Sequence, residues 1–104
     1  MSNEEDISTI LVVDDDDGIR DLLAKFLRQH NFNTVLAKNG EEMEAVLSTN
    51  IVDLIILDIL MPGKDGLTLC RETRTHSRIP ILMLTAISED VDRILGLEMA
   101  LMII

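Results

Sequence analysis

The sequence predicts an α/β fold in which a parallel sheet is covered by helices on both faces. Short apolar runs without polar alternation recur along the chain, as expected of strands that are buried on both sides. Amphipathic stretches with helical spacing separate these runs, which implies right-handed crossover connections. In addition, 47% of the residues are hydrophobic but only 2% are aromatic, so an aliphatic core is expected.

The first predicted strand covers residues 10–13, an aliphatic run that stops at four consecutive aspartates, residues 14–17. Residues 19–28 then show the spacing of an amphipathic helix, and its acidic start favours the positive end of the helix dipole. The apolar face of this helix is expected to consist of Ile19, Leu22, Leu23, Phe26 and Leu27.

The second unit begins with a short strand over residues 34–37. Asn39 and Gly40 form a turn, and a helix is expected to begin at Glu41. The buried face of that helix is expected to contain Met43, Val46 and Leu47.

Two further units complete the predicted order. A strand over residues 53–57 is followed by a Pro/Gly-rich loop and by a short helix over residues 67–73, for which Asp65 is a candidate cap. A fourth strand covers residues 81–84, and Ser88 is expected to begin a fourth helix.

Length and charge limit the possible functions. The 104 residues allow one domain, expected over residues 9–104 behind a polar leader of residues 1–8. A formal charge of −10, with no basic cluster, predicts that this segment does not bind nucleic acid directly. We expect a cytoplasmic protein without membrane association, because no secretory signal or apolar run of about 20 residues is present. Cys70 is the single cysteine and is expected to be a buried, inert thiol.

The side chains that directly follow the strands predict a metal site. Ligands of open α/β sheets bind outside the carboxyl ends of the strands, and here those positions hold Asp14, Asp15, Asp58, Thr85 and Ala86. If the first and third strands are neighbours, the three carboxylates converge and repel one another. A hard divalent cation removes this conflict, and oxygen ligands with open positions suit Mg²⁺ and a phosphoryl group.

Three other interpretations of the acidic residues are weaker. An acidic run in isolation is more often a solvated surface or a helix start. A calcium loop beginning at Asp58 fails because Leu60 stands at a ligand position. A phosphatase of the haloacid-dehalogenase type needs a second aspartate where Leu60 stands, and no general acid near Asp58 is evident.

Three segments together resemble the response-regulator receiver domain of two-component signalling. They are VVDD at residues 12–15, LDILMPGKDG at residues 57–66 and LTA at residues 84–86. The MPGKDG loop and LGLE at residues 95–98 are similar to the OmpR/PhoB-like subfamily, whose members carry a winged-helix DNA-binding domain. The resemblance implies a flavodoxin-like, doubly wound parallel sheet with strand order 2-1-3-4(-5), altered after the fourth helix.

The resemblance also implies a role for each strand-end residue. Asp58 corresponds to the receiver's phosphoacceptor, which takes a phosphoryl group from a sensor histidine kinase. Asp14 and Asp15 correspond to a Mg²⁺-binding pair, and Asp58 and the backbone carbonyl of Leu60 complete that metal site. Thr85 corresponds to the hydroxyl that turns toward the phosphoryl group, next to the small Ala86. The implied function is a conformational switch that controls an effector, expected to act in transcription, and not an enzyme beyond weak self-dephosphorylation. DNA contact would belong to an effector domain outside this segment.

The chain departs from the receiver pattern after the fourth helix. The Lys-Pro pair, fifth strand and fifth helix of the receiver pattern have no counterpart in this sequence, which has the apolar residues 99–104 in their place. We expect residues 99–102 to extend the fourth helix, because Met, Ala and Leu favour helices, rather than residues 101–104 to form a strand. The fourth strand would then be an open edge, which predicts a homodimer or a strand-exchanged oligomer. The alternative function is a phosphorylation-impaired interaction module.

Overall fold

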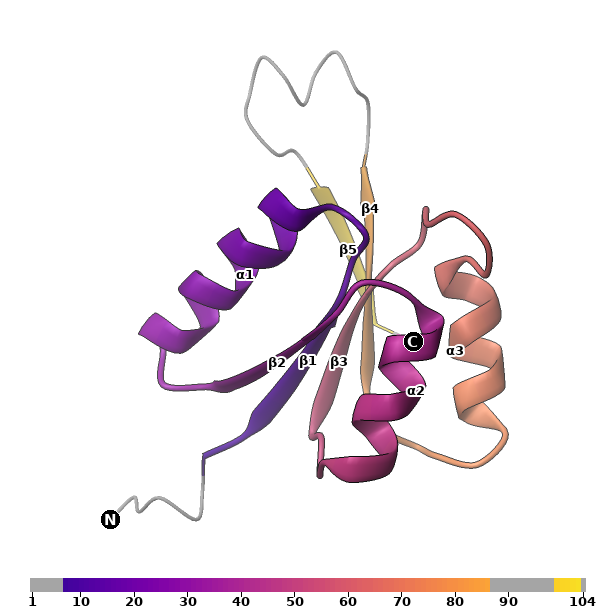
Figure 1. Ribbon diagram of the computed structural model, residues 1–104, viewed down its shortest axis with the longest axis horizontal. Helices are drawn as coiled ribbons and strands as arrows, with labels where there is room; N and C mark the ends of the chain where they lie inside the picture. Colours follow the sequence, from indigo (N-terminus) through magenta and orange to yellow (C-terminus); the bar gives the residue numbers. More distant parts are fainter. Residues whose placement is uncertain (1–6, 87–98, 104) are drawn as a thin grey trace.

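The computed structural model describes residues 7–86 and 99–103 (Figure 1). These residues form a sheet with the order β2-β1-β3-β4-β5, in which β1 to β4 are parallel and β5 is antiparallel to β4. The strands are β1 (Thr9–Val13), β2 (Asn33–Ala37), β3 (Leu54–Asp58), β4 (Ile81–Ala86) and β5 (Met99–Ile103). The predicted α/β class and the order 2-1-3-4 are confirmed.

Helices cover both faces of the sheet, as predicted. They are α1 (Asp17–Gln29), α2 (Gly40–Thr49) and α3 (Gly66–Arg74). In Figure 1, α1 lies on one side of the sheet, while α2 and α3 lie together on the other. Each helix connects two parallel strands, and this arrangement brings the carboxyl ends of β1, β3 and β4 to the same edge.

A side chain caps the first turn of each described helix. The carboxylate of Asp16 accepts a hydrogen bond from the Ile19 N–H at 3.0 Å. The Asn39 side chain does the same for α2, and Asp65 caps α3 as the sequence predicts. These bonds satisfy N–H groups that have no partner within the helix. The caps therefore set where each loop at the carboxyl edge of the sheet ends.

The core consists of two aliphatic layers separated by the sheet, because successive strand residues point to opposite faces. Leu11 and Val13 of β1 pack with Met43 of α2 and Leu69 of α3. Val12 packs on the other side with Leu27 of α1. Cys70 is buried in the first layer, as predicted. Both faces of β1 and β3 are thus inside the protein, which explains the lack of polar alternation in their sequences.

The predicted buried face of α1 is partly wrong. Leu22 and Phe26 are 49% and 55% exposed, whereas Ala24 and Leu27 are buried. The helix meets the sheet along a strip that includes the small Ala24, which permits close approach, and the apolar face read from the sequence is wider than this contact. Phe26 instead lies against the ring of His30, with 4.4 Å between ring centroids.

The expectations for the end of the chain are also wrong. Met99–Ile103 forms β5 instead of extending a helix, and it pairs with β4 in antiparallel register from Leu82↔Ile103 to Ala86↔Met99. Pairing satisfies backbone groups that an open β4 edge would leave without partners, which outweighs the modest helix preference of Met, Ala and Leu. The edge that suggested strand exchange is therefore occupied. The helix expected from Ser88, and Ile104, lie outside the described residues.

Across residues 7–86 and 99–103, no helix combines the length and the apolar character needed to cross a membrane.

Candidate functional site

Three carboxylates meet at the carboxyl edge of the sheet. In the register of β1 with β3, Val13 lies opposite Leu57, so Asp14 and Asp58 leave neighbouring strands side by side. Asp14, Asp15 and Asp58 each offer an oxygen atom, and these atoms lie within 4.8 Å of one another. The structure therefore brings together the three aspartates that the sequence predicts as a metal site.

Asp14 is the most deeply buried of the three, with 1% of its surface exposed. Its N–H donates to the Ala37 carbonyl at 3.1 Å, and its Oδ1 accepts the Asp16 N–H at 2.9 Å. Its Oδ2 is buried and has no hydrogen-bond partner. Burial raises the pKa of the Asp14 carboxyl, and the charges of Asp15 and Asp16 add to this effect.

Asp58 ends β3, and the loop after it holds its carboxylate in place. Oδ1 accepts the Leu60 N–H at 3.1 Å, and the Ile59 N–H donates to the Leu84 carbonyl of β4 at 3.0 Å. Burial raises the pKa of Asp58 to about 7, followed in importance by the negative charge of Asp14. The metal-free site thus holds more negative charge than it can stabilise.

This raised pKa predicts how stability depends on pH without metal. The pKa of Asp58 is higher in the folded protein than in the unfolded chain. Asp58 therefore contributes fully to the free energy of unfolding below about pH 4, and this contribution is lost as pH rises through about 7. The shift corresponds to at most about 4 kcal/mol, and partial exposure reduces it, so we expect a loss of about 2 kcal/mol. Urea unfolding in chelator across this range, compared with Asp58→Asn, measures it. Parallel pH profiles for the two proteins would contradict the assignment.

The aspartate group fits a small divalent cation. The buried Asp14 Oδ2 without a partner is the feature that a cation would satisfy, since unpaired buried carboxylate oxygens are costly. The donors are all oxygens, and Asp15 is exposed, which leaves the site open to water and to a phosphoryl group. Carboxylate oxygens with open positions match the preference of Mg²⁺.

The remaining predicted site residues have their backbone at the same edge of the sheet or in the loop just after β3. Thr85 and Ala86 are the last two residues of β4, and Asp58 pairs with Leu84, so their backbone lies at the same edge of the sheet. The Leu60 side chain is 65% exposed. A switch role for Thr85 and a metal-binding role for the Leu60 carbonyl stay predictions.

Sequence reasoning missed one residue of this region, Arg20. Its guanidinium donates to the main-chain carbonyl of Asp14 at 2.8 Å and pairs with the carboxylate of Asp17. The signal in the sequence was a cation three residues after the acidic run, a spacing that favours a pair with Asp17. The bond to the Asp14 carbonyl has no sequence signal, because it depends on the path of the loop.

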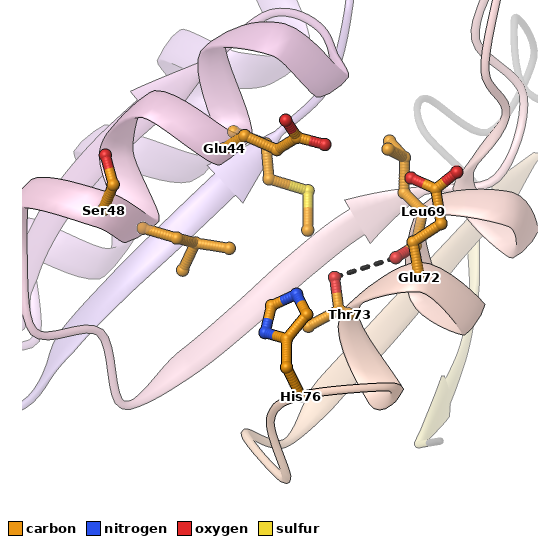
Figure 2. A pocket seen from close by; sticks show the side chains of 8 residues that line it. Glu44, Ser48, Leu69, Glu72, Thr73 and His76 are labelled. Atoms are coloured by element: carbon orange, nitrogen blue, oxygen red, sulfur yellow. Dashed lines mark hydrogen bonds between the residues drawn. The ribbon is translucent and has the colours of Figure 1, made fainter.

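A concavity with a volume of about 400 Å³ lies between α2 and α3 (Figure 2). Its apolar lining includes Met43 and Leu69. The Thr73 hydroxyl donates to the Leu69 carbonyl at 2.8 Å (Figure 2). Glu44 and Glu72 face it from the two helices. It shares no residue with the aspartate group, so the strand-end carboxylates remain the candidate site.

A known protein family and curated relatives match most of this chain. The family model described as "Response regulator receiver domain" matches residues 10–103. The chain is similar to the transcriptional regulatory protein BaeR of Escherichia coli O6:H1, with 43% identity over 95 residues that cover 91% of this chain and 40% of the relative. It is also similar to the transcriptional regulatory protein RstA of Escherichia coli K12, with 38% identity over 93 residues that cover 89% and 39%.

Solved structures of receiver proteins have a fold similar to that of this chain. The BeF₃-activated N-terminal receiver domain of Klebsiella pneumoniae RstA is 39% identical, with a TM-score of 0.73 and coverage of 85% of this chain and 75% of that one. The chemotaxis protein CheY4 of Vibrio cholerae is 29% identical, with a TM-score of 0.75 and coverage of 86% and 78%. The chain spans about two fifths of the length of its curated relatives, 40% and 39% for the two above.

Proposed function

This chain belongs to the response regulator receiver domain family, and we propose that Asp58 accepts a phosphoryl group from the phosphohistidine of a sensor kinase. The observation that carries the proposal is the convergence of three carboxylates around the end of β3, with a buried Asp14 oxygen left unpaired. Such a group is poorly suited to a purely structural role, because the three negative charges repel.

The transfer needs one nucleophile and an exact placement of the donor. A carboxylate oxygen of Asp58 forms a bond to phosphorus while the bond from phosphorus to the donor imidazole nitrogen breaks. The electron pair of that bond returns to the imidazole, and the product is an acyl phosphate on Asp58. The Leu60 N–H, 3.1 Å from Oδ1, fixes the carboxylate so that the other oxygen remains available for attack.

Asp14, Asp15 and Asp58 would hold Mg²⁺, with the Leu60 carbonyl as a fourth protein ligand. When bound, this ion supplies the positive charge that a phosphoryl group needs beside three carboxylates. The protein itself supplies the fixed positions: Asp14 is anchored through Ala37, and Asp58 through Leu60 and the end of β4. Little reorganisation is then needed at the moment of transfer.

The signalling role extends this proposal beyond the site. Phosphorylation adds negative charge and acceptor oxygens, and the Thr85 hydroxyl would turn toward them next to the small Ala86 at the end of β4. The relatives named as transcriptional regulators support an effector that acts in transcription, with a cytoplasmic location and contact with DNA through another domain. We propose no enzymatic role beyond slow loss of the phosphoryl group. We also propose that the signal is passed on through homodimerisation. A phosphorylation-impaired interaction module is not favoured, because the carboxylates are assembled.

The test is intact-mass analysis after incubation with acetyl phosphate. We expect a phosphoryl adduct when Mg²⁺ is present and none in chelator. Asp15→Asn removes an exposed carboxylate from the group and should lower labelling at limiting Mg²⁺ by at least about tenfold. Asp21→Asn, an exposed aspartate on α1, is the matched control and should label like the wild type. Equal labelling of folded protein with and without chelator would contradict the proposed site.

A further inference from the structure

The side chain of Arg20 folds back from the first turn of α1 over the loop that carries the aspartates. Nη1 donates to the main-chain carbonyl of Asp14 at 2.8 Å, and Nη2 contacts the Asp17 carboxylate. The Arg20 side chain is 14% exposed, whereas that of Asp17 is 84% exposed. The guanidinium is therefore held against the backbone of the loop rather than extended into solvent.

Arg20 contacts the acidic run at three points. Besides its two side-chain contacts, its own N–H donates to the Asp16 carbonyl at 3.0 Å. The bond to Asp14 is made to the main-chain carbonyl, so the carboxylate of Asp14 keeps its buried Oδ2 free. One cation thus fixes the loop without occupying the oxygens that a metal ion would use.

The choice of acceptor matters because four adjacent aspartates repel one another and favour an extended, solvated loop. An arginine that paired with the Asp14 carboxylate would relieve the repulsion but would compete with the metal. An arginine that binds the Asp14 main-chain carbonyl relieves part of the repulsion and leaves the Asp14 carboxylate free to bind the metal. The planar guanidinium can serve two acceptors at once, which the single ammonium of lysine does less well.

We propose that Arg20 is a positioning residue for the metal site: it holds the main chain of Asp14 and Asp15 in the geometry that binds Mg²⁺ and keeps their carboxylates available. The proposal rests on the Mg²⁺ site of the proposed function. It is independent of whether phosphoryl transfer occurs, because the binding of Mg²⁺ alone tests it.

The chain offers a matched control on the same helix. Arg28 also donates from its guanidinium to a main-chain carbonyl, that of Thr34 in β2, at 3.1 Å. It therefore links α1 to the sheet in a similar way but far along the helix from the aspartates. A general loss of helix docking would affect both variants, whereas a positioning role at the metal site belongs to Arg20 alone.

The experiment titrates Mg²⁺ into wild type, Arg20→Ala, Arg20→Lys and Arg28→Ala, following backbone amide signals by NMR, with urea unfolding of each metal-free protein in parallel. We expect Arg20→Ala to weaken Mg²⁺ binding by about tenfold or more, a size usual for residues that orient metal ligands. The Mg²⁺ affinity of Arg20→Lys should lie between those of the wild type and Arg20→Ala. Arg28→Ala should bind Mg²⁺ as tightly as the wild type does. In metal-free Arg20→Ala, faster hydrogen exchange at the Asp16 N–H, which bonds to Asp14, is the accompanying sign.

Unchanged Mg²⁺ affinity in folded Arg20→Lys and Arg20→Ala would overturn the proposal. So would an equal loss in Arg28→Ala, because the effect would then reflect docking of α1. A wild type that binds no Mg²⁺ would overturn it too. A wild type that binds Mg²⁺ with Arg20-dependent affinity, yet accepts no phosphoryl group, would leave Arg20 in this role and refute the proposed function instead.

Discussion

Asp58→Asn is expected to give no phosphoryl adduct with acetyl phosphate and Mg²⁺. The amide lacks the charged oxygen that attacks phosphorus, and among the described residues no further His, Cys, Asp or Glu side chain belongs to the group of Asp14, Asp15 and Asp58. Asp53→Asn, on the residue just before β3, is the control, because the Asp53 carboxylate accepts the Thr9 N–H at the opposite end of the strand. We expect Asp53→Asn to be labelled normally in the same intact-mass assay.

Asp58→Asn should also be more stable than the wild type in the absence of metal. Removing one of three close carboxylates relieves repulsion at a site where the pKa of Asp58 is already raised to about 7. At about pH 8 in chelator we expect a gain of about 2 kcal/mol by urea unfolding. A destabilised Asp58→Asn protein would indicate that Asp58 is needed for folding, and its failure to label would then say little about chemistry.

Gly66→Ala is expected to destabilise the protein severely. A Cβ atom at this position would lie 2.2 Å from the carbonyl oxygen of Asp58 and 2.8 Å from the Cα of Ile59. Both contacts are with backbone, which cannot turn aside as a flexible side chain can, so either α3 or the loop after β3 must shift. Because that loop directly follows Asp58 and its Leu60 N–H holds the Asp58 carboxylate, we expect a loss of about 3 kcal/mol or more in unfolding free energy together with impaired labelling.

Gly18→Ala on α1 is the control for the glycine substitution. Its Cβ would meet only the Asp16 side chain, at 3.2 Å, and alanine favours a helix over glycine by up to about 1 kcal/mol. We expect a change in unfolding free energy within about 1 kcal/mol of zero. If urea unfolding gave Gly66→Ala the same midpoint as the wild type, the close approach of α3 to the Asp58 carbonyl would be wrong.

The position of the site could be predicted because it depends on a general property of parallel sheets. The aliphatic runs before Asp14 and Asp58 identified two strands whose carboxyl ends share an edge. Caps such as Asp65 are also local signals, since a side chain bonds an amide three residues away. The cap is a local contact, whereas the site follows from a general rule for parallel sheets once the two strands are recognised.

The features that were missed depend on contacts across the fold. Whether Phe26 is buried depends on how closely α1 approaches the sheet, which helical periodicity does not specify. The strand at Met99–Ile103 depends on the open edge of β4, because the same residues favour a helix by themselves. The Arg20 contact with the Asp14 carbonyl likewise needs the path of the loop.

The most direct test of the central claim is to locate the phosphoryl group. After labelling with acetyl phosphate and Mg²⁺, borohydride reduces an aspartyl phosphate to homoserine, and a tryptic peptide covering residues 39–64 contains Asp53 and Asp58. Fragment masses should place homoserine at position 58, with Asp53 intact and no conversion in unlabelled protein. Homoserine at any other position, or none in protein that carries the adduct, would contradict the assignment of Asp58 as the phosphoacceptor.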